Sequence, residues 1–218
     1  MTRKAVEETD ARITFMDAGA LADPARFDAV LARVSAARRE QVLRLRPGAA
    51  QRCSLAAGLL LRDALAAEGL SDADAETAVG AYGKPYLPRR PDVQFSLSHS
   101  GTWAMCAIAD RPVGCDIQLP APRSLRVARR FFTDAECARI FALPTEGARQ
   151  AMFYRIWALK ESFVKCLGLG LALPLDSFSV LPEADGTISL AYAGEGEFRL
   201  FEPEGPDGCF CACCLRLS

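Results

Sequence analysis

The segment VGCDIQ, residues 113–118, places two oxygen donors side by side. In an extended strand alternate residues share a face, so Asp116 and Gln118 point one way while the apolar residues of the segment point the other. Carboxylate and amide oxygens suit a hard cation such as Mg²⁺. The polar outward face of an antiparallel strand has the same spacing, so both interpretations stay open for this segment alone.

Two turn segments carry groups that suit an anion. Ser98 and His99, the single histidine of the chain, lie where FSLSHSG passes from strand to turn, and both can donate hydrogen bonds to a phosphate. In YGKPYLP, Gly83 and Pro85 fix the backbone around Lys84, which suits a lysine that meets an anion. Taken alone, ordinary turn chemistry and a solvated lysine are the simpler explanations.

The segment FYRIWALKESFVKCLGLG, residues 153–170, predicts a helix with unusual charge placement. At 3.6 residues per turn its apolar residues share one arc; Lys160 falls within that arc, and Glu161 and Lys165 fall on its flank. An ordinary amphipathic helix keeps its charges opposite the apolar face. The alternative is a surface ion pair between Glu161 and Lys165, with the Lys160 ammonium reaching water along the core.

A second acidic residue, Glu136, has a structural explanation of its own. Thr133-Asp134-Ala135-Glu136 follows two phenylalanines and matches a capping box, with Thr133 as N-cap and Glu136 at the third helical position. A chemical role for Glu136 must therefore add to that capping role. The sequence contains no Walker motif, no dinucleotide-binding glycine pattern, no kinase signature and no G-x-S-x-G elbow.

The composition favours a globular protein without a charge bias toward any partner. The 218 residues are 50% hydrophobic and carry a formal net charge of −1, so we expect the protein to bind neither nucleic acids nor a membrane surface. The charged N-terminus predicts no signal peptide, and no apolar run approaches the roughly 20 residues that span a bilayer. The nine cysteines lack the paired C-x-x-C spacing of a zinc site and suit reduced, mostly buried thiols, which favours a cytoplasmic location.

The order of predicted elements indicates an α+β fold. Helical segments predominate up to residue 68 and are followed by strand-like segments up to residue 118; helix-rich sequence to residue 167 is then followed by strands again. We therefore predict a pseudo-twofold pair of similar subdomains, residues 1–112 and 113–218, each with helices packed on a small antiparallel sheet. A cleft between them is the expected ligand site.

Four motifs in this order, YGKPYLP, FSLSHSG, VGCDIQ and FFTDAE…WALKESFVKCLGLGL, resemble those of one family. The chain resembles 4′-phosphopantetheinyl transferases of the surfactin-synthetase-activating type, over about residues 54–180. The resemblance implies a monomer that binds coenzyme A between its halves and uses Mg²⁺. It also implies transfer of the phosphopantetheine group to a serine of acyl or peptidyl carrier proteins, usually in secondary metabolism such as peptide or polyketide synthesis, with release of adenosine 3′,5′-bisphosphate.

The resemblance also implies roles for individual residues. Metal ligands would be Asp116, Glu161 and, at the third position, Gln118. Coenzyme A would meet the basic and hydroxyl groups Arg38, Arg39, Arg52, Lys84, Ser98, His99, Lys160 and Lys165. Glu161 is the first choice of general base and Glu136 the second, while Lys165 would stabilise charge on the leaving phosphate.

The chain departs from the family pattern at one position, where Gln118 replaces a second acid. We expect weaker Mg²⁺ binding rather than loss of activity, because Asp116, Glu161 and the pyrophosphate still supply oxygens. Two alternatives stay open: a coenzyme A-binding module without transferase activity, and a Mg²⁺-dependent nucleotide pyrophosphate hydrolase. A basic segment at Arg123, Arg126, Arg129 and Arg130 suits an acidic carrier helix or, equally, a solvated helix face.

Overall fold

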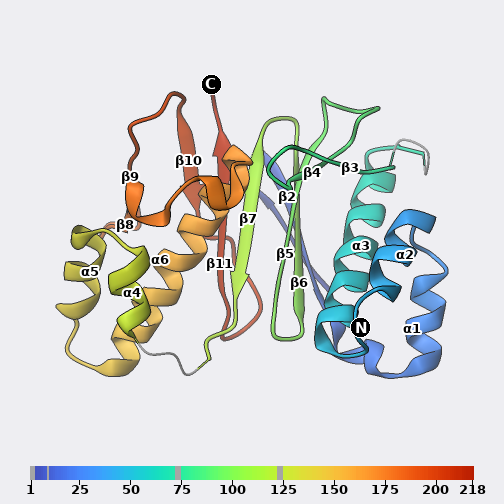
Figure 1. Cartoon of the computed structure of the whole chain (residues 1–218), viewed down its shortest axis with the longest axis horizontal. Helices are drawn as coiled ribbons and strands as arrows, with labels where there is room; N and C mark the ends of the chain where they lie inside the picture. Colours follow the sequence, from blue (N-terminus) through green and yellow to red (C-terminus); the bar gives the residue numbers. More distant parts are fainter. Residues whose placement is uncertain (1–2, 9, 72–74, 122–124) are drawn as a thin grey trace.

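The computed structural model describes residues 3–8, 10–71, 75–121 and 125–218. Two antiparallel sheets lie in the middle of the molecule, and helices cover the outer side of each (Figure 1). Hydrophobic side chains fill the spaces between these layers. The predicted α+β class, with helices packed on small antiparallel sheets, is confirmed.

The first part of the chain builds one helical layer and one sheet. Its elements are β1 (Arg3–Glu8), β2 (Ala11–Asp17), η1 (Ala18–Ala22), α1 (Pro24–Leu31), α2 (Ala36–Leu43), α3 (Ala49–Ala67), β3 (Ala78–Val79), β4 (Pro85–Tyr86), β5 (Gln94–Ser100) and β6 (Trp103–Ala109). The sheet has the order β1-β2-β6-β5. Asp23 caps α1 by accepting from the Arg26 N–H, and Pro24 is its first residue.

The second part of the chain builds the other helical layer and sheet. Its elements are β7 (Val113–Gln118), η2 (Leu125–Val127), α4 (Ala128–Phe131), α5 (Asp134–Phe141), α6 (Glu146–Leu167), η3 (Gly170–Ala172), η4 (Leu175–Ser177), β8 (Ser179–Pro182), β9 (Ile188–Ala191), β10 (Phe198–Phe201) and β11 (Phe210–Arg216). The sheet has the order β10-β11-β7. β8 and β9 form a separate hairpin beside α6.

The space between the two sheets explains the apolar residues of β7. Val113, Cys115 and Ile117 are buried there against Ile13 and Phe15 of β2. The other face of β7 turns toward α6, so the predicted alternation of this strand is confirmed, but its polar face is not exposed: Asp116 is only 3% accessible. All nine cysteines are free thiols, and most are buried in these layers.

Helix α6 is longer than its motif predicted. It begins after Thr145, whose side chain accepts from the Ala148 N–H, and it ends at Gly168, which adopts a left-handed conformation with φ of 72°. The predicted apolar arc is buried, including Phe153, Ile156 and Phe163. α6 packs along both β7 and β11 (Figure 1), so any side chain on its β7-facing flank meets the polar face of that strand.

The two sheets meet along β5 and β7, which are edge strands of different sheets. Serine hydroxyls of β5 accept backbone N–H groups of β7: Ser96 from Cys115 at 3.0 Å, Ser98 from Ile117 at 3.4 Å and Ser100 from Leu119 at 2.9 Å. The constant sequence separation means that the two strands run parallel here. We call this set, Ser96, Ser98 and Ser100, the serine ladder; it joins the two sheets by side chains.

Candidate active site

Asp116 is the centre of the polar cluster between β7 and α6. Its Oδ1 accepts hydrogen bonds from the Ser98 hydroxyl at 2.7 Å and from the Lys165 ammonium at 2.6 Å. Its Oδ2 accepts from the Gln118 amide at 2.8 Å. A buried carboxylate needs such donors, because an ionised group without partners is costly in a protein interior. The cluster therefore holds the Asp116 side chain in one orientation.

Lys165 connects this cluster to the helix. Its ammonium donates to Asp116, to the Ser98 hydroxyl at 3.0 Å and to the Cys115 carbonyl at 3.1 Å. Burial lowers the pKa of Lys165, but Asp116, Cys115 and Glu161 together outweigh that effect, and the net pKa is raised. The ion pair of Lys165 is thus formed with Asp116 across the strand–helix contact.

Glu161 lies one helical turn before Lys165 and faces the same cluster. Burial raises the pKa of its carboxyl group, the negative charge of Asp116 raises it further, and Lys165 opposes both. Two carboxylates that repel each other in a partly buried site are a favourable place for a cation, because a cation offsets the charge of both. Asp116 and Glu161 therefore fit a divalent metal ion, with Gln118 beside them.

The close approach of β7 and α6 depends on a glycine. A Cβ at Gly114 would lie 1.9 Å from the Ser162 carbonyl oxygen, 2.3 Å from the Cys166 nitrogen and 2.9 Å from the Lys165 carbonyl carbon. These are backbone atoms of α6, so no rotamer change can relieve the clash. Gly114 therefore allows the helix to lie against the strand, which brings Glu161 and Lys165 to Asp116.

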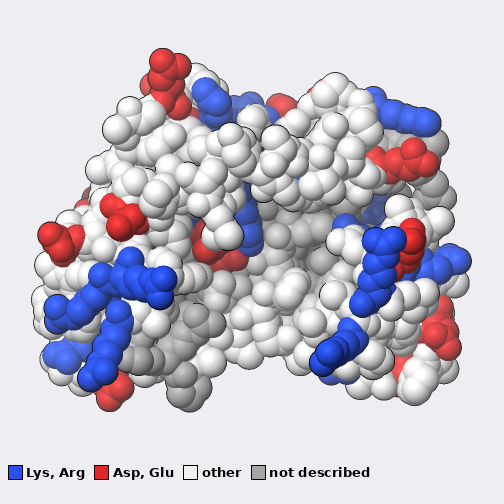
Figure 2. All heavy atoms as spheres, viewed as in Figure 1, with Lys and Arg blue, Asp and Glu red and all other residues white. Residues whose placement is uncertain are grey.

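A pocket of about 360 Å³ opens beside the cluster, with Glu161 and Lys165 in its wall. Its lining is mostly apolar and includes Phe95, Leu97 and Val164. Lys84 also lines it; its ammonium donates to the Val113 carbonyl at 3.0 Å and the Cys166 carbonyl at 3.2 Å. Figure 2 shows a hollow between the two halves of this face, with charged atoms in its wall.

Comparison with known proteins identifies the family. Residues 112–213 match the 4′-phosphopantetheinyl transferase superfamily model. A 4′-phosphopantetheinyl transferase of Bacillus subtilis is 39% identical over 184 residues, which cover 84% of this chain and 77% of that protein. The chain belongs to the 4′-phosphopantetheinyl transferase family. A second relative, the transferase ffp of Bacillus subtilis, is 37% identical over 75% of this chain and 73% of its own length.

A shorter match links the chain to a third transferase. The 4′-phosphopantetheinyl transferase Sfp of Bacillus subtilis strain 168 is 43% identical over 121 residues, which cover 56% of this chain and 54% of that protein. The transferase family predicted from the four sequence motifs is thereby confirmed, and with it the enzyme class.

The structure places the predicted residues Ser98 and His99 in different surroundings. Ser98 is buried, and its hydroxyl is committed to Asp116, Lys165 and β7. His99 points from the opposite face of β5 and is exposed. The pKa of His99 is lowered, first by partial burial and then by the nearby positive charge of Lys165.

Lys160 and Glu136 are brought together, but in the core rather than in the Asp116 cluster. Both side chains are 0% exposed, and the Lys160 ammonium lies 2.6 Å from Glu136 Oε1. The ammonium also donates to the Phe178 carbonyl at 2.6 Å, and Glu136 accepts from the N–H groups of Thr133 and Val180. The predicted capping box is confirmed. The alternative in which the Lys160 ammonium reaches water is wrong, because the ammonium is buried in an ion pair with Glu136.

The three predicted arginines lie on the helices of the first half. Arg52 is half-buried near the start of α3, and the thiol of its neighbour Cys53 donates to the Gly101 carbonyl in the turn after His99. Arg39 is exposed and donates to the Leu31 and Ala32 carbonyls. Arg38 packs against Gly58 of α3, and burial lowers its pKa. Of the three arginines, Arg52 is therefore the one adjacent in sequence to a residue that contacts the β5–β6 turn.

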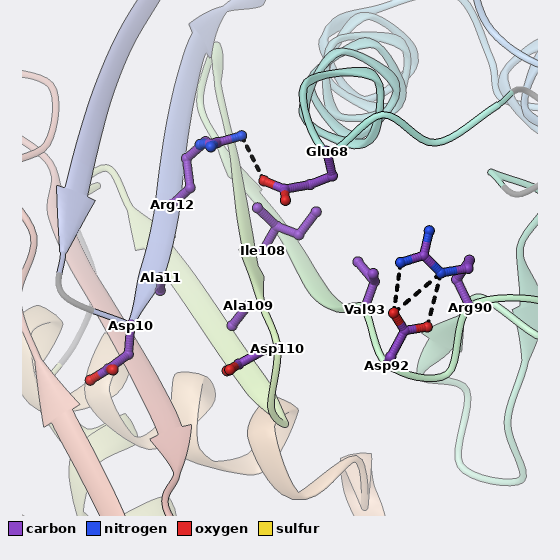
Figure 3. Close-up of a pocket in the computed structure, with 10 residues that line it drawn as sticks. All are labelled: Asp10, Ala11, Arg12, Glu68, Arg90, Asp92, Val93, Ile108, Ala109 and Asp110. Atoms are coloured by element: carbon purple, nitrogen blue, oxygen red, sulfur yellow. Dashed lines mark hydrogen bonds and ion pairs between the residues drawn. The ribbon is translucent and has the colours of Figure 1, made fainter.

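A pocket of about 420 Å³ lies elsewhere, between the C-terminal end of α3 and the β5–β6 sheet edge (Figure 3). Its charged groups pair locally, as Arg12 does with Glu68 and Arg90 with Asp92, and none of the predicted site residues lines it. In the described ranges, no group of three or more histidine, cysteine or acidic side chains could hold a metal ion, and no helix is long and apolar enough to cross a membrane.

Two features of the site were not expected from the sequence. The first is the close approach of a helix to Gly114. A glycine inside a strand such as VGCDIQ can indicate such an approach, but it does not say which element approaches. The second is the serine ladder. The three alternating serines can be read from FSLSHS, but the sequence does not show that their hydroxyls bond to the backbone of β7. For Lys160, the sequence does carry a signal: a lysine within an apolar arc either reaches water or pairs with a buried acid, and in the structure Glu136 is that acid.

Proposed function

We propose that this protein transfers the 4′-phosphopantetheine group of coenzyme A to a serine hydroxyl of an acyl or peptidyl carrier protein. The observation that supports this most strongly is the cluster of Asp116, Glu161 and Lys165 in the wall of an apolar pocket. Acidic and basic groups at one end of a pocket suit a pyrophosphate with its metal ion, and the apolar lining suits the pantetheine chain.

The donor set fits Mg²⁺. Asp116 and Glu161 supply carboxylate oxygens, and Gln118 can turn its amide oxygen toward the same ion. When bound, Mg²⁺ would offset negative charge on the pyrophosphate and on the leaving phosphate. With Gln118 in place of an acid, the site carries one negative charge less, so we propose that this protein needs more Mg²⁺ than a relative with a carboxylate there.

The remaining chemistry belongs to the protein's own side chains. The serine oxygen of the carrier forms a bond to the β-phosphorus of coenzyme A, and the bond from that phosphorus to the bridging oxygen breaks, which releases adenosine 3′,5′-bisphosphate. We propose that Glu161 accepts the serine proton, directly or through water, since its raised pKa makes it a better base. Lys165 stabilises charge on the phosphate oxygens.

Glu136 is not needed as a base in this scheme. Its carboxylate accepts from Lys160 and from backbone N–H groups and is 0% exposed, so it has no path to a carrier serine. We propose that Lys160 and Glu136 instead hold α6 against α5 and the strand β8. A buried ion pair with all its hydrogen bonds made can perform that structural role.

The nucleotide end of coenzyme A requires basic groups near the β5–β6 turn. We propose that His99 and Arg52 contact its phosphates, because His99 is exposed at the end of β5 and Arg52 is on the α3 end that touches the same turn. Lys84 lines the pocket and contributes positive charge beside the pyrophosphate. Arg38 and Arg39 lie farther along the α1–α2–α3 layer and are assigned no contact.

The carrier protein is proposed to dock over α4 and α5. Lys and Arg side chains gather on this part of the surface (Figure 2). Arg129 and Arg130 are exposed, and their guanidinium groups lie over the Phe141 and Phe131 rings at 4.8 and 5.2 Å. Held in this way, they suit an acidic helix. Arg126 adds to the surface, and Arg123 lies outside the described residues.

The two sheets divide the chain into two halves. We propose that residues 1–112 and 113–218 are pseudo-twofold subdomains with the active site between them, since each sheet takes its strands from one side of this boundary. We also propose a functional monomer, as the family resemblance implies. The nine free cysteines suit a reducing compartment such as the cytoplasm.

The test is mass spectrometry of an apo carrier protein after incubation with this protein, coenzyme A and Mg²⁺. We expect the carrier to gain one phosphopantetheine group on a serine. Binding of coenzyme A without any gain in carrier mass would favour a binding module instead. Release of adenosine 3′,5′-bisphosphate in the absence of a carrier would favour a pyrophosphate hydrolase.

A further inference from the structure

The three hydroxyls of the serine ladder are not equivalent. Each accepts one β7 backbone N–H, which satisfies an edge strand that lacks a backbone neighbour on that side. Ser100 does this at the exposed end of the ladder. Ser98 alone also donates to Asp116 Oδ1, at 2.7 Å, and accepts from the Lys165 ammonium, at 3.0 Å. It therefore contacts both members of the ion pair.

The contacts of Ser98 join the two halves of the molecule. Asp116 belongs to β7 and Lys165 to α6, whereas Ser98 comes from β5 in the other sheet. Its side chain is fully engaged and only 7% exposed, so it has no donor left for a ligand in this arrangement. Its single hydroxyl hydrogen is directed to Asp116, which leaves the hydroxyl oxygen to accept from Lys165.

We propose that Ser98 is a positioning residue that fixes the orientation of the Asp116 carboxylate and the Lys165 ammonium from the opposite half of the molecule. This role differs from the phosphate contact that the family resemblance implies for Ser98. Groups that orient a metal-binding carboxylate typically affect metal affinity or activity by about 10- to 100-fold when they are removed. The proposal rests on the proposed function in one respect, namely that Asp116 binds Mg²⁺.

The experiment compares Ser98→Ala with Ser100→Ala in the full-length protein. Both variants lose one ladder hydrogen bond to β7, but only Ser98→Ala loses the contacts to Asp116 and Lys165. Three quantities are measured for each: thermal unfolding, Mg²⁺ affinity by calorimetry with coenzyme A present and no carrier, and kcat and KM for a carrier substrate. Ser98→Thr and Ser98→Val form a second pair that differs only in the hydroxyl group.

We expect Ser98→Ala to unfold at a lower temperature than Ser100→Ala, because it also removes a donor from the buried Asp116 carboxylate, and activity is therefore compared at a temperature at which both are folded. Ser98→Ala should bind Mg²⁺ about tenfold or more weakly and lose kcat by a similar factor, while its KM for the carrier changes little. Ser100→Ala should keep the wild-type Mg²⁺ affinity and kcat. If Ser98→Ala does not fold, Ser98→Thr should bind Mg²⁺ more tightly than Ser98→Val by about the same factor.

Two results would overturn the positioning role. One is a Ser98→Ala protein that binds Mg²⁺ and turns over like Ser100→Ala; the other is equal Mg²⁺ affinity in the Thr and Val pair. Failure of the proposed function has a different signature, because the wild-type protein itself would then leave the carrier unmodified. The two failures are therefore distinguished by the wild-type reaction.

Discussion

Replacing Gly114 by alanine tests the strand–helix contact that assembles the site. The added Cβ would lie 1.9 Å from the Ser162 carbonyl oxygen, whereas real Cβ atoms essentially never come closer than 3.0 Å to another heavy atom. The difference, 3.0 minus 1.9, is about 1.1 Å, which is the least distance by which α6 must withdraw along that contact. Because the opposing atoms are backbone, the whole segment around Glu161 and Lys165 must move.

The withdrawal has two measurable consequences. Overpacking of this kind typically costs about 1–3 kcal/mol of unfolding free energy, which lowers Tm by about 2–12 °C for a chain of this size. A misplacement of about 1 Å in a catalytic group can reduce turnover by about 100-fold. We therefore expect Gly114→Ala to lose far more activity than stability.

The assay combines calorimetric unfolding with kcat for carrier modification, at a temperature at which the variant is folded. Gly147→Ala is the matched control, because Gly147 lies in the same helix and its Cβ would meet no atom within 4 Å. It should stay fully active and be equally or more stable, since alanine is about 1 kcal/mol better than glycine in a helix. A Gly114→Ala protein with wild-type Tm and kcat would refute the role given to this glycine.

Three further predictions concern the charges around the site. Gln118→Glu should lower the Mg²⁺ concentration for half-maximal rate by about tenfold; an unchanged requirement would show that this position does not tune the metal. Lys160→Met should cost about 3–5 kcal/mol in urea unfolding because it leaves the buried Glu136 carboxyl group without its ion-pair partner, and adding Glu136→Gln should recover part of that loss; equal stability of all three proteins would contradict the buried pair. The single histidine gives an unambiguous NMR titration: the pKa of His99 should lie below 6.5 and rise in Lys165→Met, whereas no rise would mean that Lys165 does not act on the ring.

Local patterns allowed much of the fold to be predicted. The period of 3.6 in residues 153–167 and the alternation in VGCDIQ depend on neighbours within one element, and both were confirmed in the buried faces of α6 and β7. The charged strand β1 and the short pair β3–β4 were not predicted. Both belong to local hairpins, β1 with β2 and β3 with β4. β1 is rich in charged residues, which disfavour strands, and β3 and β4 have only two residues each, too few for an alternation to show.

The sequence indicated which residues belong to the candidate site better than it indicated how they contact one another. Asp116, Glu161 and Lys165 were recognised by motif, but the sequence could not tell which charge pairs with which. Lys165 pairs with Asp116 rather than with Glu161 at i−4, because the absent side chain of Gly114 lets α6 approach the strand. A contact of Ser98 with a ligand stays a prediction, and the sequence did not indicate that its hydroxyl bonds to Asp116 and Lys165.

The most direct test of the central claim is the intact mass of an apo carrier protein incubated with coenzyme A, Mg²⁺ and either the wild-type protein or its Asp116→Ala variant. The wild-type reaction should add one phosphopantetheine group to the carrier serine, and removal of Mg²⁺ or of the Asp116 carboxylate should abolish that gain. Equal modification by both proteins would contradict the assignment of Asp116 as the centre of the site. An unmodified carrier with the wild-type protein, despite bound coenzyme A, would contradict the transferase itself.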